Sequence, residues 1–260
     1  MTLFEDRIDA AEQLAKRVEE SIDKNVGKWR RELEQRKQQQ TSNDYDVIIL
    51  AIPRGGVIIG DVLSSMLGAK LDIIVSKKIG APSNSELAIG AVMQDGSYVL
   101  NKDIIGMLNV PPSYITEQAN ILKKEIERRL QSFRGEREEH SSYYNDYDRF
   151  EGKIVIIVDD GIATGATMLS AARWLKTKQN CCKMLIIAVP VAPPPSPSLQ
   201  SSSSSSNEDV VSKLNQIADK VIILYRPEPF YSVGQFYKQF EQVSDAEVRE
   251  IMIRHGYVPL

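Results

Sequence analysis

Histidine and cysteine are scarce in this chain, which has two of each among 260 residues. Cys181 and Cys182 are adjacent, a spacing that suits neither a metal site nor a structural disulfide, so we expect buried thiols that pack as small hydrophobic side chains. His140 and His255 both stand in polar surroundings. Histidine-based catalysis therefore has little support, and an active site would depend on other side chains.

Long hydrophobic runs and a strong net charge are also absent. No stretch of about 20 apolar residues and no signal peptide is visible, which predicts a cytoplasmic protein without a membrane partner. The formal net charge of −3 disfavours a nucleic-acid partner. With 42% hydrophobic and 26% charged residues, the composition is that of an ordinary globular domain with a sizeable core.

One stretch carries most of the functional information. Ile154 to Val158 is an uninterrupted β-branched run, which predicts a strand buried in a parallel sheet, and ligands bind at the carboxyl ends of such strands. Asp159 and Asp160 follow, and a loop of small residues and threonines then opens a helix. Such a loop brings backbone N–H groups and the positive end of a helix dipole close to an anion. Its residues are Gly161, Ala163, Thr164, Gly165, Ala166 and Thr167.

Two other phosphate-binding loops do not fit this stretch. A Walker loop needs Lys and then Ser or Thr after its second glycine, whereas Ala166 follows Gly165. A dinucleotide fingerprint needs glycines directly after the strand, where the two aspartates stand. Because adjacent carboxylates would repel a phosphate, we expect them to face sugar hydroxyls or a hard cation. The other interpretation is an ordinary strand-to-helix turn capped by Asp and Thr.

Two further apolar runs end in cationic residues. Val47 to Ile52 leads into a Pro-Arg-Gly-Gly loop that contains Arg54, whose guanidinium suits a bidentate grip on phosphate. Leu71 to Val75 precedes Lys77 and Lys78, whose ammonium groups can neutralise an anion. The alternatives are a surface arginine in a glycine turn and a solvated second lysine.

Val155 to Thr167 resembles the phosphoribosyl-pyrophosphate (PRPP) loop of type I phosphoribosyltransferases, with hydrophobic residues, two acids, three spacers and Thr-Gly-x-Thr. Glu86 to Ala91 is similar to a run found in an uncharacterised subgroup of these proteins. The resemblance implies an α/β fold with a mainly parallel central sheet flanked by helices. It also implies a transferase that binds PRPP with Mg²⁺ and passes phosphoribose to a small nitrogenous acceptor, with release of pyrophosphate. Many family members are dimers, so a homodimer is one expected assembly.

The resemblance also implies roles for individual residues. Asp159 and Asp160 would hold the ribose hydroxyls, and either one is a candidate contact of Mg²⁺, which would bind mainly through PRPP oxygens. Arg54 and Lys77 would stabilise the departing pyrophosphate. A cis peptide, common in this loop of the family, is expected between Arg54 and Gly55. The implied substrate-binding residues are Gly55, Gly56, Glu86, Gly161, Ala163, Thr164, Gly165, Ala166, Thr167, Phe230 and Tyr231.

The rest of the chain is arranged around these motifs. Apolar residues at helical spacing predict an N-terminal helix in 1–40, packed on the core or on a partner copy, ahead of a phosphoribosyltransferase-like domain over 45–258. We expect a helical insertion at about 101–149, with its charged side solvated, and a disordered Pro/Ser-rich insertion at about 193–207. Ala81 to Val92 resembles the mobile loop of the family, returning to a strand.

Two functions other than transfer stay open at the level of sequence. A regulatory protein that senses PRPP or a nucleotide would keep the same binding loops without transferring anything. A hydrolase of phosphoribosyl compounds would use the same phosphate cradle and admit water. Phe230 and Tyr231 are candidates to stack on a flat acceptor, but no base-specific hood is recognised, which leaves the class of acceptor open.

Overall fold

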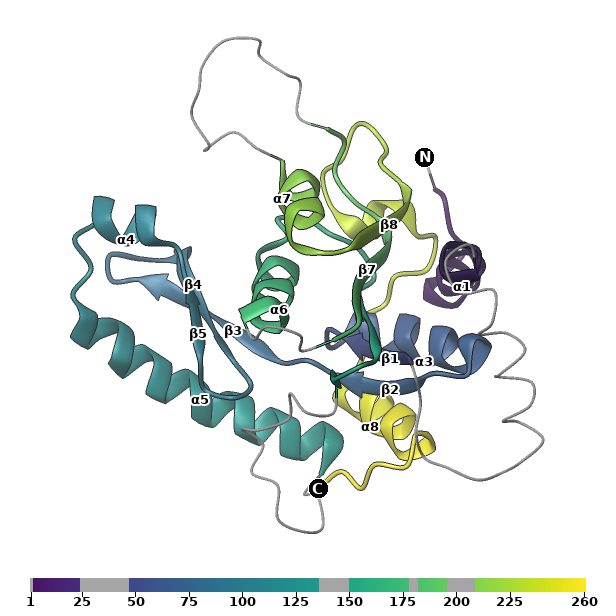
Figure 1. The fold of residues 1–260 in the computed structure, drawn as a ribbon, viewed down its shortest axis with the longest axis horizontal. Coiled ribbons are helices and arrows are strands. Elements are labelled where there is room, and N and C mark those ends of the chain that lie inside the picture. The colour runs from purple at the N-terminus through teal and green to yellow at the C-terminus, as the bar shows by residue number, and fades with distance from the viewer. Residues whose placement is uncertain (1, 24–46, 136–149, 178–181, 196–208) are drawn as a thin grey trace.

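The computed structural model describes residues 2–23, 47–135, 150–177, 182–195 and 209–260. A five-stranded parallel sheet in the order β2-β1-β6-β7-β8 forms its centre, and an antiparallel sheet of β3, β4 and β5 lies to one side (Figure 1). The strands are β1 Val47–Ala51, β2 Lys70–Ile73, β3 Ser76–Ala81, β4 Asn84–Met93, β5 Tyr98–Leu100, β6 Ile154–Val158, β7 Met184–Val191 and β8 Lys220–Tyr225. The helices are α1 Arg7–Asp23, α3 Gly55–Leu67, α4 Lys102–Met107, α5 Pro112–Arg134, α6 Ala166–Thr177, α7 Val210–Ile217, the 3-10 helix η3 Val233–Phe236 and α8 Asp245–Arg254.

The central strands form where the sequence has short apolar runs. All five residues of β1 and all five of β6 are buried, as expected for strands covered on both faces. Ala51 at the end of β1 is in register with Ile73 of β2 and Val158 of β6. The segments that follow these three strands therefore begin at the same edge of the sheet. This architecture confirms the predicted α/β fold with a mainly parallel sheet flanked by helices.

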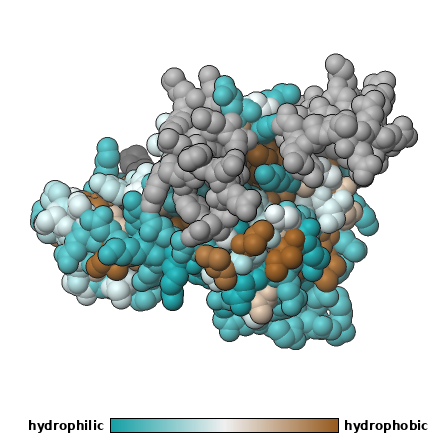
Figure 2. All heavy atoms as spheres, turned by 90° about the horizontal axis from the view of Figure 1, so that it is seen from below, coloured by the Kyte–Doolittle hydropathy of each residue, from teal (hydrophilic) through white to brown (hydrophobic). Residues whose placement is uncertain are grey.

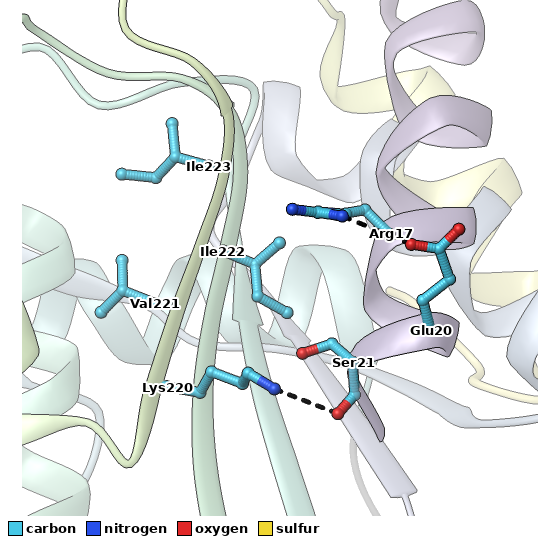
Figure 3. Close-up of a pocket in the computed structure, with 7 residues that line it drawn as sticks. All are labelled: Arg17, Glu20, Ser21, Lys220, Val221, Ile222 and Ile223. Carbon is cyan, nitrogen blue, oxygen red and sulfur yellow. Dashed lines mark hydrogen bonds and ion pairs between the residues drawn. The ribbon is translucent and has the colours of Figure 1, made fainter. Parts of the chain in front are cut away.

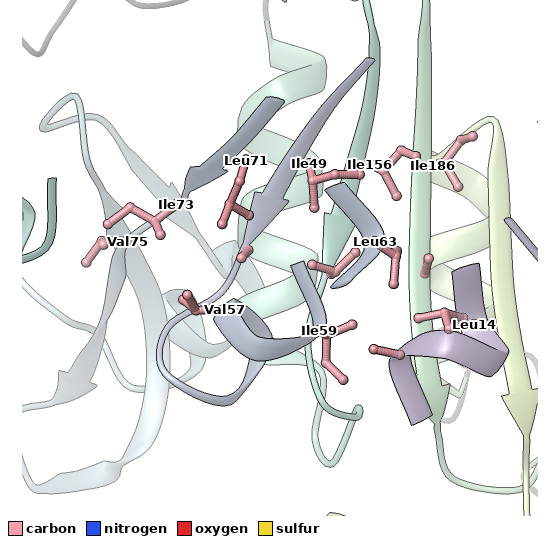
Figure 4. Close-up of a cluster of buried hydrophobic side chains, with 14 of the residues drawn as sticks. Leu14, Ile49, Val57, Ile59, Leu63, Leu71, Ile73, Val75, Ile156 and Ile186 are labelled. Atoms are coloured by element: carbon pink, nitrogen blue, oxygen red, sulfur yellow. The ribbon is translucent and has the colours of Figure 1, made fainter. Parts of the chain in front are cut away.

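Helices cover the two faces of the central sheet in separate hydrophobic layers. Ile49 belongs to a layer built with α1 and α3, whereas Leu50 points to the opposite face and belongs to a layer with α6 and α7. Figure 4 shows Ile59 and Leu63 of α3 lying between strand side chains and Leu14 of α1. Helix α3 is thus sandwiched between the sheet and the N-terminal helix.

The N-terminal helix packs on the core of its own chain. Leu14 and Val18 are fully buried and belong to the same hydrophobic layer as α3. Ile8, near the start of α1, is 51% exposed despite its apolar side chain. The described part of the helix therefore supports packing on the core, while the predicted continuation over 24–40 lies outside the described residues.

A β-hairpin occupies the segment expected to be a mobile loop. β3 and β4 pair antiparallel from Ser76 with Met93 to Ala81 with Asn84, which leaves a short turn between the two strands. The Tyr114 hydroxyl of α5 donates a hydrogen bond of 3.1 Å to the Gly80 carbonyl and ties the hairpin to that helix. The predicted return to a strand corresponds to β4, but that strand begins earlier than expected and pairs with β3, which leaves only a short turn.

Helix α5 fills most of the described part of the predicted insertion and is anchored at its C-terminal end. The Arg134 guanidinium Nε lies 3.4 Å from Asp72 Oδ1 of β2, with both side chains 2% exposed or less. Asp72 Oδ1 also accepts a hydrogen bond of 2.7 Å from the Ile73 amide. Tyr257, near the C-terminus of the chain, donates to the Leu71 carbonyl over 3.0 Å. The end of α5 is therefore joined to the sheet by a buried ion pair, and 136–149 and 196–208 lie outside the described residues.

The surface is mostly hydrophilic. On the face shown in Figure 2, small hydrophobic groups are separated by hydrophilic residues. Cys182 packs against the hydrophobic layer of α6 and α7 as a small hydrophobic side chain, as expected, but it is only half-buried. Cys181 lies outside the described residues. None of the helices within the described residues is long and apolar enough to cross a bilayer.

The buried ion pair generates a stability prediction. Replacing Arg134 by Met leaves the Asp72 carboxylate buried without its guanidinium, and we expect a loss of about 3–5 kcal/mol of unfolding free energy. The measurement is urea denaturation followed by circular dichroism. The control is Lys124→Met, an exposed position on the same helix, for which less than about 0.5 kcal/mol is expected. Equal midpoints and slopes for the two variants would contradict the assigned role of the pair.

Candidate functional site

The two loops predicted to bind a phosphorylated sugar lie against each other at the carboxyl edge of the sheet. The Ile52 amide donates to the Val158 carbonyl over 2.9 Å, which extends the β1–β6 pairing into both loops. A Cβ atom on Gly55 would lie 1.9 Å from Asp160 Oδ2, and one on Gly56 would lie 2.8 Å from the Val158 carbonyl oxygen. Gly56 is therefore required for the two backbones to approach this closely, and a side chain at Gly55 would displace the Asp160 carboxylate.

Arg54 stands at the N-terminus of α3, directly before these glycines. The structure has a non-proline cis peptide between Pro53 and Arg54, so the expectation of a cis bond between Arg54 and Gly55 was one bond too late. The Arg54 Nη1 atom lies 3.3 Å from Asp245 Oδ1 at the start of α8, with the arginine side chain 28% exposed. The guanidinium thus remains accessible at the rim of the site.

Asp159 and Asp160 form a tightly coupled pair at the end of β6. The Asp160 amide donates to Asp159 Oδ1 over 2.9 Å, and both side chains are partly buried. Burial and the neighbouring negative charge of Asp160 raise the pKa of Asp159 well above its usual range, although the amide hydrogen bond and Arg7 oppose this shift. Burial also raises the pKa of Asp160, against the effect of Arg7. The carboxylate pair therefore carries an electrostatic cost in the folded state.

Arg7 of α1 is part of this site, although the sequence interpretation did not include it. Its Nε atom donates to Asp160 Oδ2 over 2.9 Å, and its Nη1 atom donates to the Glu241 carbonyl over 2.9 Å. Its guanidinium carbon lies 3.8 Å from the centre of the Phe240 ring. Tyr237 completes the surroundings of the pair, because its hydroxyl donates to the Asp160 carbonyl over 2.6 Å. Side chains from the N-terminal helix and from the segment after β8 thus hold Asp160 in place.

In the loop after the acids, Ile162 is buried and both glycines lie against valine side chains. A Cβ on Gly161 would lie 2.6 Å from Val233 Cγ1, and one on Gly165 would lie 2.1 Å from Val210 Cγ2. Gly165 also has a φ of +71°, which favours glycine. Four predicted substrate-binding residues are exposed at this helix start, namely Ala163, Thr164, Ala166 and Thr167.

The two predicted site residues on the antiparallel sheet have different surroundings. Lys77 lies at the start of β3, and its Nζ atom is 3.0 Å from Glu125 Oε2 of α5. Glu86 lies on β4, is 85% exposed and pairs with Lys78 Nζ over 2.8 Å. This pairing lowers the pKa of the Glu86 carboxyl. Lys77 faces the insertion helix near Arg54, whereas Glu86 belongs to the outer part of the hairpin.

The segment after β8 reaches the site through residues other than the two predicted aromatics. Phe230 packs against Phe236, with ring centres 5.2 Å apart, and Tyr231 is 84% exposed. Val233 contacts Gly161, and Tyr237 contacts the Asp160 carbonyl. Val233 and Tyr237 could not be found from sequence periodicity. They follow a strand and lie in or beside η3, which is too short to show a pattern.

A separate cavity of about 250 Å³ lies between α1 and the edge strand β8 (Figure 3). Lys220 Nζ donates to the Ser21 carbonyl across it, and Arg17 pairs with Glu20 on its helical wall. Figure 3 shows Ile222 facing this cavity. Since it runs along an edge strand rather than at the carboxyl ends of the central strands, it does not belong to the candidate site.

Known proteins are similar to this chain in sequence and in fold. The model of the phosphoribosyl transferase domain family matches residues 20–219. Two Mycobacterium tuberculosis proteins, from strains CDC 1551 / Oshkosh and H37Rv, are named "Putative phosphoribosyl transferase" and are each 33% identical to this chain over 248 residues. This alignment covers 95% of the chain and 46% of each relative, so the chain spans about half the length of these proteins.

A solved structure is similar over nearly the whole chain. The protein TT1426 from Thermus thermophilus has 27% sequence identity and a TM-score of 0.68, with 97% of this chain and 99% of that chain covered. The chain that carries the Gly and Asp loops thus has known relatives in sequence and in fold. The family model covers more than half of the chain, which therefore belongs to the phosphoribosyl transferase domain family.

Proposed function

We propose that this protein binds PRPP with Mg²⁺ and transfers its phosphoribosyl group to a small nitrogenous acceptor, releasing pyrophosphate. The observation that carries this proposal is the contact between the Gly55–Gly56 loop and the Asp159–Asp160 pair at one edge of the sheet. This contact supports the proposal, because it brings a loop proposed to bind phosphate next to a carboxylate pair proposed to bind sugar hydroxyls. Membership of the phosphoribosyl transferase domain family supports the same reaction class.

Asp159 and Asp160 are proposed to orient the ribose through its hydroxyl groups. Carboxylate oxygens accept hydrogen bonds strongly, and Asp160 is held in place by Arg7 and Tyr237. The exposed helix start at Ala163 to Thr167 would cradle the 5-phosphate with backbone N–H groups and threonine hydroxyls. These contacts would fix the anomeric carbon relative to an incoming nucleophile.

Arg54 and Lys77 are proposed to bind the pyrophosphate group. In the reaction, a nitrogen lone pair forms a bond to the anomeric carbon while the bond from that carbon to a pyrophosphate oxygen breaks. The oxygen leaves with the bonding electrons, so cationic side chains at this position stabilise the developing charge. When bound, Mg²⁺ would neutralise charge on PRPP oxygens, and the carboxylates of Asp159 and Asp160 are suitable hard donors for it.

The acceptor would approach from the segment after β8. Val233 and Tyr237 of this segment contact the loop and the backbone of the acid pair. Phe230 and Tyr231 stand just before them, and the exposed Tyr231 ring is available to stack on a flat acceptor. We propose that these aromatics, rather than the hairpin residue Glu86, contact the acceptor.

The first test is pyrophosphate release from PRPP and Mg²⁺, measured alone and with pooled purines, pyrimidines and small amines. The double variant Asp159→Asn with Asp160→Asn should lower acceptor-dependent release by roughly a hundredfold or more, because the ribose loses both orienting carboxylates. A control with the same change in charge replaces exposed Asp103 by Asn and Glu117 by Gln, and it should retain the wild-type rate.

The outcomes of this test separate the candidate functions. Acceptor-dependent release supports transfer, whereas release that is equal with and without any acceptor indicates hydrolysis. Calorimetric binding of PRPP without release indicates a sensor. Full activity in the double variant at Asp159 and Asp160 would refute the assigned role of the pair.

A single Asp159→Asn variant should be less active but more stable. The raised pKa means that the folded state holds this proton to higher pH than the unfolded state does. Wild-type stability is therefore greatest below the unfolded pKa and falls as pH rises through the folded pKa. We expect the variant to lack this loss and to have a higher unfolding free energy than the wild type at pH 8, with a smaller difference near pH 5.

Denaturant unfolding at pH 5, 6.5 and 8 measures this difference, and Asp61→Asn provides a comparison of opposite sign. Burial opposes ionisation of Asp61, but hydrogen bonds from His255 and Arg254 outweigh it and lower the pKa of its carboxyl. The stability that Asp61 contributes is present above its unfolded pKa and is lost as pH falls through its folded pKa. Removing that carboxylate should destabilise the protein at pH 8. An Asp159→Asn variant that is less stable than wild type at pH 8 would show that Asp159 contributes a net favourable contact.

A further inference from the structure

A cavity with an excess of positive charge lies between the insertion helix α5 and the Pro53–Gly56 loop. Its volume is about 370 Å³, within the range of small-ligand pockets. Four cationic side chains and two carboxylates line it, although the whole chain has a net charge of −3. The lining residues are Arg54, Lys77, Glu125, Arg128, Arg129, Ser132, Phe133 and Asp245.

The cavity lies between the residues proposed to bind pyrophosphate and helix α5. Arg54 and Lys77 follow strands of the central sheet, whereas Arg128 and Arg129 stand on α5. The Arg129 guanidinium carbon lies 5.5 Å from the centre of the Phe133 ring, which is 1% exposed. A buried ring therefore supports the arginine from the core side. Part of the charged face of α5, expected to be solvated, thus forms the wall of a pocket.

The two carboxylates of the cavity already contact two of its cations. Glu125 Oε2 lies 3.0 Å from Lys77 Nζ, and Asp245 Oδ1 lies 3.3 Å from Arg54 Nη1. These pairs are partly exposed, so they are weak and can exchange for another anion. An entering polyanion would compete with both carboxylates for Lys77 and Arg54, and it would meet the excess charge of the arginines on α5.

We propose that Arg128 and Arg129 of α5 complete a diphosphate-binding subsite with Arg54 and Lys77, and that Glu125 opposes anion entry. This assignment rests on the proposed function, because the diphosphate it would hold is the pyrophosphate group of PRPP. A planar guanidinium binds phosphate oxygens through two parallel N–H groups, and two adjacent phosphates need several such donors. The insertion helix thereby supplies one wall of the leaving-group site.

The test is isothermal titration of the full chain with inorganic pyrophosphate in the presence of Mg²⁺, and separately with ribose 5-phosphate. Arg128→Gln should weaken pyrophosphate binding about three- to tenfold, and Glu125→Gln should tighten it about two- to fivefold. Lys124→Gln removes one positive charge from an exposed position of the same helix that does not line the cavity, and it should leave the affinity unchanged. Ribose 5-phosphate affinity should stay the same in all three variants.

Opposite shifts for Arg128→Gln and Glu125→Gln, with an unchanged Lys124→Gln, would support the subsite. Equal pyrophosphate affinity in Arg128→Gln and wild type would overturn it, and so would a wild type that binds ribose 5-phosphate but no pyrophosphate. An equal loss of ribose 5-phosphate affinity in Arg128→Gln would also overturn it, because the effect would not be local. If the shifts appear but no acceptor supports pyrophosphate release from PRPP, the proposed transfer fails and the subsite stands.

Discussion

The candidate site depends on a steric constraint between two loops, where residues without a side chain meet a pair of acids. β1 and β6 are adjacent and in register, so the chain leaves both strands at the same edge of the sheet. Gly55 and Gly56 lie so close to Asp160 and Asp159 that a Cβ on either glycine would collide with the opposite loop. Gly56 packs on the backbone of Val158 and Asp159, whereas Gly55 leaves room for the Asp160 carboxylate. The two glycines therefore let Arg54 and the acids stand side by side.

The electrostatics of the acid pair explain why distant segments gather around it. Burial raises the pKa of Asp159, and the neighbouring negative charge of Asp160 raises it further. Arg7 offsets part of this repulsion, and the Phe240 ring and the Glu241 carbonyl orient the arginine. A backbone bridge between Phe4 and Tyr237 holds the two supporting segments together. The N-terminal helix therefore does more than cover the sheet, because it carries a cation that stabilises the ionised form of Asp160.

Sequence patterns predicted the central sheet well because its strands are continuous apolar runs buried on both faces. The runs ending at Ala51 and Val158 produced strands with boundaries within a residue of those expected. The glycines and acids after them were singled out because Val155 to Thr167 resembles the PRPP loop of type I phosphoribosyltransferases. The local sequence pattern was thus sufficient to predict both these strands and the loops that follow them.

Contacts between distant parts of the chain were not predictable in the same way. Arg7 is one basic residue at the start of an amphipathic helix, and nothing in its neighbourhood indicates a partner more than 150 positions away. The hairpin of β3 and β4 was missed because Ala81 to Val92 contains Pro, Gly and polar residues that also suit a loop. Arg128 and Arg129 belong to a mixed charge run, and only the packing of α5 beside Lys77 gives them a common cavity.

The anchoring of α5 connects the fold to the chemistry of that cavity. Arg134, which pairs with buried Asp72, stands six positions after Arg128, or fewer than two helical turns away. The end of the helix that lines the cavity is thus the end that is tied to β2, and the Tyr257 hydrogen bond to Leu71 reinforces the same region. A buried ion pair is a poor source of net stability, but it specifies one orientation of the groups that it joins. In this protein it fixes an inserted helix at the distance where its arginines face Arg54 and Lys77, so that an insertion outside the central sheet becomes a wall of the site.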